Sequence, residues 1–143
     1  RVITEEFAKG IGALEHICPH FHLSLQSGCE ETLKRMNRKY TTAQYADVVK
    51  GLREAFRDVA ITTDIMTGFP GETDEEFTET KQYLDDISLY EMHIFKYSKR
   101  EGTKAAIMSG QVDEQIKNVR SDELLILNKN LRNMLTLQKR VIQ

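Results

Sequence analysis

Polar and flexible residues follow each of three stretches of the sequence that have the composition of β-strands. They form three sets, Gln26-Ser27-Gly28, then Thr67-Gly68-Phe69 with Gly71, then Tyr97-Ser98 with Arg100. Such amides and hydroxyls can bind a ribose or a carboxylate, the glycines leave backbone open to an adenine edge, and the tyrosine ring can stack. If the strands are parallel, the three sets gather at one end of the sheet, where α/β proteins bind ligands.

The same three sets contain no activated nucleophile. Ser27 has no histidine at motif spacing, and Ser98 lies between Tyr97 and Lys99. A serine without an adjacent base is a weak nucleophile, so the sequence does not support hydrolytic triad chemistry. We assign no residue a catalytic role.

Three histidines and a cysteine fall within seven residues, as His16, Cys18, His20 and His22. Imidazole and thiolate are common metal ligands, so this composition is compatible with a metal site. Pro19 separates the cysteine from the strand face shared by His20 and His22, and no carboxylate is spaced to complete a ligand set. We favour polar residues entering a strand, with the metal site as the alternative.

An acidic residue, Asp64, interrupts an otherwise apolar strand. A carboxylate is costly in that position unless it is paired or lies near a site. A ligand contact and a structural hydrogen bond are both open interpretations of Asp64.

The turn after this strand, residues 68–71, leads into a helix with an acidic start. Thr73 and Glu76 form a capping box, and carboxylates crowd the positions around it, at Glu72, Asp74, Glu75, Glu76 and Glu79. Acidic side chains disfavour an anion at a helix N-terminus. The turn therefore suits a sugar, an adenine or a cationic ligand better than a phosphate.

Two groups of cations follow the first and third strands, with Tyr40 and Tyr97 among them. RNA contact and simple solvation are both possible for such groups. The members are Lys34, Arg35, Arg38 and Lys39, followed by Lys96, Lys99, Arg100 and Lys104.

Helices and strands alternate along the chain. The helix signals are an N-cap at Thr4, capping boxes at Ser27–Glu30 and Thr41–Gln44, and a long helix from Asp113 to the end. Strands are predicted at 20–25, around 61–65 and at 92–97, with an irregular segment at 98–106. The apolar positions expected to face inward include Phe7, Ile11, Leu14, Tyr45, Val48, Val49, Leu52, Phe56, Phe77, Leu84, Ile87, Leu124, Leu127, Leu131, Met134 and Val141.

Length and composition indicate one globular unit, residues 1–143, with 40% hydrophobic content and a net charge of -2. The isolated cysteines Cys18 and Cys29 favour a reducing, cytoplasmic location, and no apolar run approaches the ~18 residues of a membrane span. The chain opens directly ahead of a helix signal and closes inside a helical pattern with no glycine or proline stop, so we expect a piece of a longer polypeptide. The predicted fold class is α/β, with three parallel strands, flanking helices and a long C-terminal helix. Because a closed barrel needs about eight strands, the piece is interpreted as the second half of a larger barrel.

Four motifs in order resemble the radical S-adenosylmethionine methylthiotransferases over nearly all of the chain. The resemblance is strongest to the branch that modifies threonylcarbamoyladenosine in tRNA, with the isopentenyladenosine and ribosomal-protein branches as alternatives. The motifs are His22–Gly28, Leu33–Thr41, Thr63–Thr73 and Phe95–Thr103.

The resemblance implies the C-terminal half of a partial (β/α)6-type radical barrel. The parent enzyme would use S-adenosylmethionine, two [4Fe-4S] clusters and an external electron donor to add a methylthio group to C2 of the modified adenosine at position 37 of tRNA. An N-terminal cluster domain and a C-terminal RNA-binding domain would lie outside this chain. The chain lacks the Cys-x-x-x-Cys-x-x-Cys loop, so it would ligate no cluster and would be inactive alone.

Site roles are also implied by the resemblance, position by position. The residues expected to contact the cofactor are Gln26, Ser27, Asp64, Met66, Gly68, Phe95 and Tyr97. The residues expected to contact the tRNA backbone are Lys34, Arg35, Arg38, Lys39, Lys99 and Arg100. The rival from another class is a nucleotide- or RNA-binding α/β module without redox chemistry. We also expect self-association through the exposed barrel edges.

Overall fold

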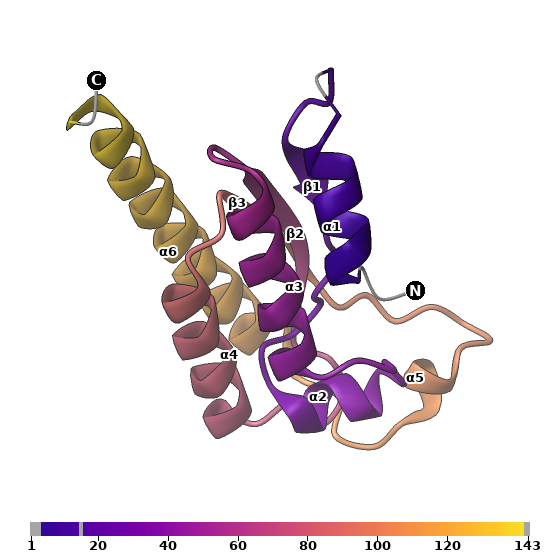
Figure 1. Ribbon diagram of the computed structural model, residues 1–143. Coiled ribbons are helices and arrows are strands. Elements are labelled where there is room, and N and C mark those ends of the chain that lie inside the picture. The colour runs from indigo at the N-terminus through magenta and orange to yellow at the C-terminus, as the bar shows by residue number, and fades with distance from the viewer. Residues whose placement is uncertain (1–3, 15, 142–143) are drawn as a thin grey trace.

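Three parallel strands form a single sheet in the computed structural model, which describes residues 4–14 and 16–141 (Figure 1). The strands are β1 (His20–His22), β2 (Ala60–Thr67) and β3 (Glu91–Lys96), and β2 lies in the centre. The register pairs His22 with Thr62 on one side of β2 and Asp64 with His93 on the other. The predicted α/β class with three parallel strands is thus confirmed.

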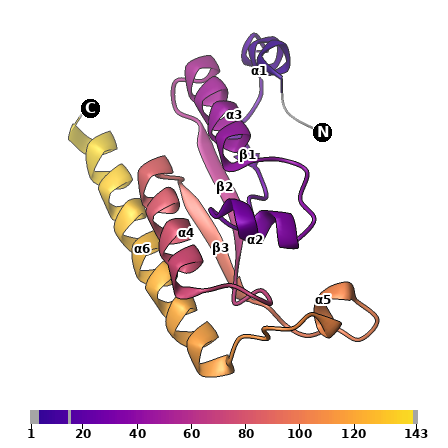
Figure 2. The same ribbon diagram turned by 90° about the horizontal axis from the view of Figure 1, so that it is seen from below.

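Helices connect the strands and end the chain. Figure 2 shows α4 and α6 running side by side, and the segment that carries α5 extending away from the sheet. Within the described residues, no helix is both long enough and apolar enough to cross a membrane. The helices are α1 (Glu5–Gly12), α2 (Glu30–Arg35), α3 (Thr42–Ala55), α4 (Asp74–Ile87), α5 (Lys104–Ile107) and α6 (Glu114–Val141).

One face of the sheet packs against helices and carries the core. Because side chains alternate along a strand, Ile61, Thr63 and Ile65 of β2 point to this face, and all three are buried. Ile61 and Ile65 pack with Leu52 of α3, Leu84 of α4 and other core residues. The opposite face, which we call the open face, carries polar and half-exposed side chains, namely His20, His22, Ser24, Thr62, Asp64, Met66, His93 and Phe95.

Local capping signals were good predictors of the helix starts. The Thr4 hydroxyl accepts a hydrogen bond from the backbone N–H of Phe7 in α1. In the capping boxes Thr41–Gln44 and Thr73–Glu76, each side chain accepts from the backbone N–H of the other residue. Asp113 accepts the backbone N–H of Gln115 at 2.7 Å, so α6 begins as predicted. These contacts span two or three residues and need no tertiary structure.

The predicted capping box Ser27–Glu30 is wrong. Cys29 is the N-cap of α2, and Ser27 is fully buried with its hydroxyl 3.1 Å from that of Thr80 on α4. Glu30 instead accepts from the N–H and hydroxyl of Thr42 at 2.5 and 2.6 Å. The side chains of this motif therefore join helices that are distant in sequence.

The first predicted strand, 20–25, is shorter than expected. Regular strand pairing ends at His22. Beyond it, the Thr63 side chain bonds the backbone in place of a β2 backbone group: its hydroxyl donates to Leu23 O at 2.6 Å and accepts from Leu25 N at 2.9 Å. Gln26 has a φ of 73° and rejoins Ile65 as an isolated bridge.

The side chains predicted to face inward on α1 and α6 were only partly correct. Phe7 and Leu14 are 53% and 58% exposed, because α1 makes its main contacts with α3 and leaves these side chains outside the core. Leu124 and Leu131 of α6 are buried as predicted, but Met134 is 51% exposed. A 28-residue helix is about 42 Å long, so α6 extends past a sheet whose longest strand has eight residues. The side chain of Val141 lies outside the described residues.

Candidate functional site

A pocket of about 300 Å³ lies at the carboxyl ends of β2 and β3. Met66 and Phe95 project from neighbouring strands at paired positions, so they form one wall together. Residues of the segment after β3 complete the lining. The lining residues are Met66, Phe95, Lys96, Tyr97, Ser98, Arg100, Thr103 and Ala105.

The wall formed by residues 98–105 is shaped by local hydrogen bonds. The Thr103 hydroxyl donates to Arg100 O at 2.8 Å and accepts from Ala106 N at 3.3 Å, so it closes a turn and begins α5. Gly102 has a φ of +78°, which permits this turn without a side-chain penalty. This turn helps to place Thr103 and Ala105 in the lining.

Tyr97 forms the floor of the pocket and is 8% exposed. Its backbone N–H donates to Thr67 O at 2.8 Å, and its ring meets Phe69 edge-on with 5.5 Å between centroids. The hydroxyls of Tyr97 and Thr67 are buried and have no hydrogen-bond partner within the described residues. A buried hydroxyl without a partner is unfavourable, so a ligand or water that bonds it would be stabilised.

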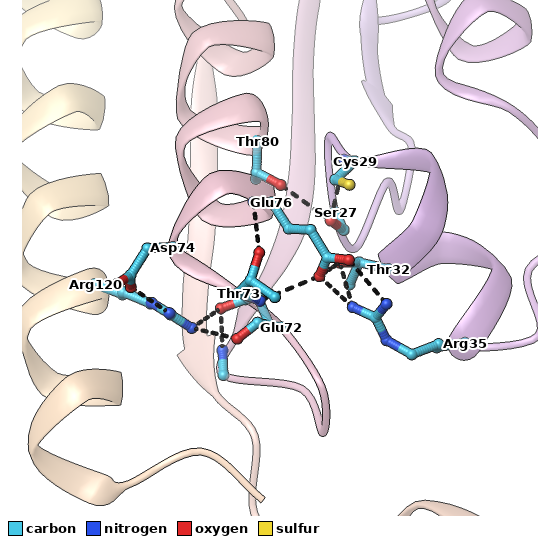
Figure 3. A network of polar contacts seen from close by, with 11 residues as sticks. Ser27, Cys29, Thr32, Arg35, Glu72, Thr73, Asp74, Glu76, Thr80 and Arg120 are labelled. Atoms are coloured by element: carbon cyan, nitrogen blue, oxygen red, sulfur yellow. Dashed lines mark hydrogen bonds and ion pairs between the residues drawn. The ribbon is translucent and has the colours of Figure 1, made fainter. Parts of the chain in front are cut away.

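A buried ion pair, drawn in Figure 3, fixes the turn after β2. Gly68 N donates to Glu72 Oε1 at 2.9 Å, and Arg120 Nη1 of α6 lies 2.7 Å from the same oxygen. Burial raises the pKa of Glu72, while the Gly68 amide and the Arg120 guanidinium oppose that shift. The acidic start of α4 is thus used to fix the turn, with Asp74 also paired to Arg120 at 2.7 Å.

A second ion pair joins α2 to α4 beside the same turn (Figure 3). Arg35 forms a forked pair with the carboxylate of Glu76, and one nitrogen also lies 3.2 Å from the hydroxyl of Thr32. The hydrogen bond from Arg35 lowers the pKa of Glu76. The guanidinium of Arg35 is therefore engaged within the fold rather than free at the surface.

The residues predicted to contact a cofactor fall into two groups. Met66, Phe95 and Tyr97 are brought together at the pocket, and Asp64 lies two residues before Met66 on the open face. The second group begins with Gln26, which follows β1 and is 6% exposed. Its backbone N–H donates to Asp64 O at 2.8 Å, and its carbonyl accepts from Met66 N at 2.9 Å.

Ser27 and Gly68 lie away from the pocket lining. Ser27 is buried beneath α4, and a Cβ on Gly68 would come within 2.1 Å of the Lys117 side chain. Sequence reasoning missed Thr103 and Ala105, although a threonine after Gly102 is a usable N-cap signal. It also missed Arg120, which no local pattern marks.

The predicted RNA-contacting cations differ in their surroundings. Lys34 pairs with Glu31 at 2.7 Å, and Lys39 donates to the Asn37 side chain at 2.8 Å. Among the described residues, Arg38, Lys99 and Arg100 have no ion pair and are exposed. Tyr40 is not free to stack, because its hydroxyl bonds the backbone carbonyls of Ser24 and Leu25.

Metal-ligating side chains do not come together in the part of the chain that the structure describes. No three histidine, cysteine or acidic side chains in this part of the chain lie close enough to hold a metal ion. His20 and His22 both reach the hydroxyl of Thr62, at 3.2 and 3.1 Å. His20 and His22 therefore bond within the sheet, and Cys18 is exposed.

Comparison with known proteins gives a family. The model of the radical SAM superfamily matches residues 1–84. The threonylcarbamoyladenosine tRNA methylthiotransferase MtaB of Bacillus subtilis (strain 168) is 44% identical over 90% of this chain and 29% of its own length. A tRNA-2-methylthio-N(6)-dimethylallyladenosine synthase of Desulfotalea psychrophila (strain LSv54 / DSM 12343) is 50% identical over 75% of this chain and 24% of its own.

A third relative acts on a protein according to its name. The ribosomal protein uS12 methylthiotransferase RimO of Clostridium botulinum (strain Langeland / NCTC 10281 / Type F) is 38% identical over 96% of this chain and 31% of its own length. The chain thus spans less than a third of each of these relatives.

Proposed function

This chain belongs to the methylthiotransferase family of the radical SAM superfamily, and on that premise we propose that it is the second half of the radical barrel of a tRNA methylthiotransferase. The observation that carries the proposal is the pocket at the carboxyl ends of β2 and β3, which places Met66, Phe95 and Tyr97 together. Within the parent enzyme the chain supplies cofactor and RNA contacts. Alone it is not catalytically competent.

The pocket suits S-adenosylmethionine in its chemistry. Met66 and Phe95 give an apolar surface for an adenine, and the hydroxyl of Tyr97 is a buried group that lacks a partner within the described residues. When bound, this cofactor supplies the radical chemistry and the methyl group. Gln26, Ser27, Asp64 and Gly68 complete the proposed contact set around the neighbouring strand ends.

The two [4Fe-4S] clusters belong to parts of the parent outside this chain. Three thiolates are needed in one loop, and the described residues offer no such group. We therefore place the cluster domain, the cluster loop and an RNA-binding domain in the rest of a longer cytoplasmic enzyme, which takes electrons from an external donor. In isolation the chain is expected to self-associate, because the outer edges of β1 and β3 are unpaired among the described residues.

The proposed substrate is N6-threonylcarbamoyladenosine at position 37 of tRNA, with methylthiolation at C2. The exposed cations Arg38, Lys99 and Arg100, together with Lys34 and Lys39, would contact the RNA backbone. Arg35 contributes indirectly, through the Glu76 pair that fixes α2.

Relatives of all three branches are similar to this chain, at 38 to 50% identity. Dimethylallyladenosine in tRNA and a ribosomal protein are the alternatives. The deciding experiment is mass spectrometry of tRNA nucleosides from a strain that lacks the parent gene. Loss of 2-methylthio-threonylcarbamoyladenosine supports the proposal, and unchanged levels of it would overturn the substrate.

A further inference from the structure

Ile107 of α5 is the most exposed large apolar side chain in the part of the chain that the structure describes, at 87%. It lies on the segment between β3 and α6, residues 98–112, which extends away from the sheet and which we call the projecting segment (Figure 2). Single exposed apolar residues are common at protein surfaces, so exposure alone assigns no role. The anchoring and the charge of the projecting segment give Ile107 a more specific setting.

Both ends of the projecting segment are anchored to the body of the protein. Just before it, the backbone N–H of Tyr97 donates to Thr67 O at 2.8 Å, and Lys117 Nζ donates to Tyr97 O at 3.2 Å. Near its other end, Gly110 O accepts from Gly71 N at 2.7 Å, and a Cβ on Gly110 would lie 3.2 Å from the Gly71 backbone. The segment is therefore fixed against the end of β2 and the turn that follows it.

The short helix that carries Ile107 is held by its neighbours, because a helix of four residues is marginal by itself. The side-chain amide of Gln111 donates to the carbonyls of Ala105 and Met108 at 2.9 and 3.0 Å, which satisfies the end of α5. Ala106 is buried, with 6% exposure, while the next residue, Ile107, projects. Ile107 is thus presented in a defined position, and a partner that binds it loses little affinity to ordering.

The projecting segment is cationic. Lys99, Arg100 and Lys104 are exposed and form no ion pair among the described residues. Glu101 is the only acidic residue between positions 98 and 112. RNA offers both features that such a segment can bind, phosphates for the cations and flat apolar base faces for the isoleucine. Charge complementarity therefore favours RNA as the partner over an apolar protein surface.

An enzyme that acts on a base has to take that base out of its stack, which costs free energy. Apolar side chains, isoleucine among them, insert between neighbouring bases in protein–nucleic acid complexes and replace part of the lost stacking contact. Such a wedge has to be apolar, exposed and firmly mounted, because a mobile side chain would yield to the stack. Ile107 meets all three conditions.

We propose that Ile107 is a wedge that inserts between neighbouring bases of an RNA loop, while Lys99, Arg100 and Lys104 bind the phosphates beside it. Ile107 acts on the stack that surrounds the modified base, so it is a positioning residue and not a catalytic one. The identification of the partner as RNA rests on the proposed function.

The test uses the full-length polypeptide that contains this chain and an RNA hairpin whose loop carries 2-aminopurine beside an adenosine. The fluorescence of 2-aminopurine rises when the base is unstacked, and saturating wild-type polypeptide should raise it about twofold or more. Ile107→Ser should abolish most of this rise. Its Kd for the hairpin, measured by fluorescence anisotropy, should weaken by no more than about threefold, because the contacts of the wedge mainly offset the cost of unstacking. Ile107→Leu keeps an apolar wedge and should restore the rise.

Ile126→Ser is the matched control, because Ile126 is 62% exposed on α6 and undergoes the same chemical change. Its fluorescence rise should equal that of the wild type. Lys104→Gln tests the phosphate contacts separately. It should weaken the Kd and reduce the salt dependence of log Kd by about 0.7, the value for one phosphate contact on a single strand. At saturation its fluorescence should match the wild type, so the wedge and the cations have different readouts.

Equal fluorescence rises in Ile107→Ser and in the wild type would overturn the wedge while the proposed function stands, since the RNA is still bound. A wild-type polypeptide that binds no RNA overturns both. If Ile107→Ser lowers the melting temperature of the full-length polypeptide and leaves the fluorescence rise unchanged, Ile107 packs against another part of that polypeptide, and the wedge is again overturned.

Discussion

Arg120 Nη1 on α6 lies 2.7 Å from Oε1 of Glu72, 48 residues earlier in the chain, and both side chains are almost fully buried. The other nitrogen of the same guanidinium lies 2.7 Å from Asp74, and its carbon lies 5.4 Å from the centre of the Phe77 ring. One arginine thus ties the last helix to the turn after β2 and to the first residues of α4. The geometry of that turn depends on a residue far away in sequence.

Removing Arg120 should destabilise the chain strongly. Arg120→Met leaves the Glu72 carboxylate buried without its cation, which costs about 3–5 kcal/mol when a buried pair is broken in this way. Urea unfolding followed by circular dichroism would measure the loss. The control is Asp74→Asn, because the Asp74 side chain is 89% exposed and surface pairs contribute about 1 kcal/mol or less. Equal losses in the two variants would show that burial of the pair is not what matters.

The Arg35–Glu76 pair should contribute to stability in a pH-dependent way. Because the pKa of folded Glu76 lies below its ordinary value, the native state releases this proton more readily than the unfolded chain. The contribution is therefore present above the ordinary glutamate pKa, about 4.3, and is lost as the pH falls through the folded value.

The measurement is unfolding free energy from pH 7 to pH 3 for the wild type and for Arg35→Met. The difference between them should shrink toward acid pH. Lys50→Met is the control, since Lys50 forms only an exposed 3.9 Å pair with Glu54. A difference for Arg35→Met that stays constant across this range would contradict the pKa direction.

Gly68 is constrained twice, by its backbone and by a neighbour. Its φ of +71° is unfavourable for other residues, and an added Cβ would lie 2.1 Å from Cγ of Lys117. Gly68→Ala should therefore cost about 1–3 kcal/mol for the backbone alone, with an extra cost for the clash. In a Lys117→Ala background only the backbone cost should remain, so the double-mutant cycle should give a coupling of about 1 kcal/mol or more. Additive losses would show that Lys117 moves aside freely.

Features that depend on neighbours in sequence could be predicted from the sequence. The boxes Thr41–Gln44 and Thr73–Glu76 each involve residues three apart, and the apolar composition of β2 identified it as a strand. Ser27 has the same local pattern as Thr41, yet its hydroxyl turns to Thr80, 53 residues away. A capping motif cannot reveal which helix will pack over it.

The same distinction between local and long-range features applies to the pocket. Phe95 and Met66 were predictable because strand ends gather in a parallel sheet. Ser98 and Arg100, which follow β3, were predicted at this end and do line the pocket. Thr103 and Ala105 were missed, because their position depends on the turn that Gly102 and Thr103 form. The engagement of Arg35 by Glu76 likewise follows from α2 packing beside α4, which no charge pattern shows.

Tyr97→Phe should separate stability from binding at the pocket. In the described part of the chain the buried Tyr97 hydroxyl has no partner, so removing it should leave the unfolding free energy unchanged or raise it by about 1 kcal/mol. If the hydroxyl bonds the cofactor, the same change should weaken S-adenosylhomocysteine binding by the full-length polypeptide about fivefold to tenfold. Tyr45→Phe is the contrasting control, because the Tyr45 hydroxyl donates to Leu23 O at 2.9 Å and its loss should lower stability without changing affinity. A Tyr97→Phe protein that is less stable yet binds normally would mean that its hydroxyl serves the fold and not the ligand.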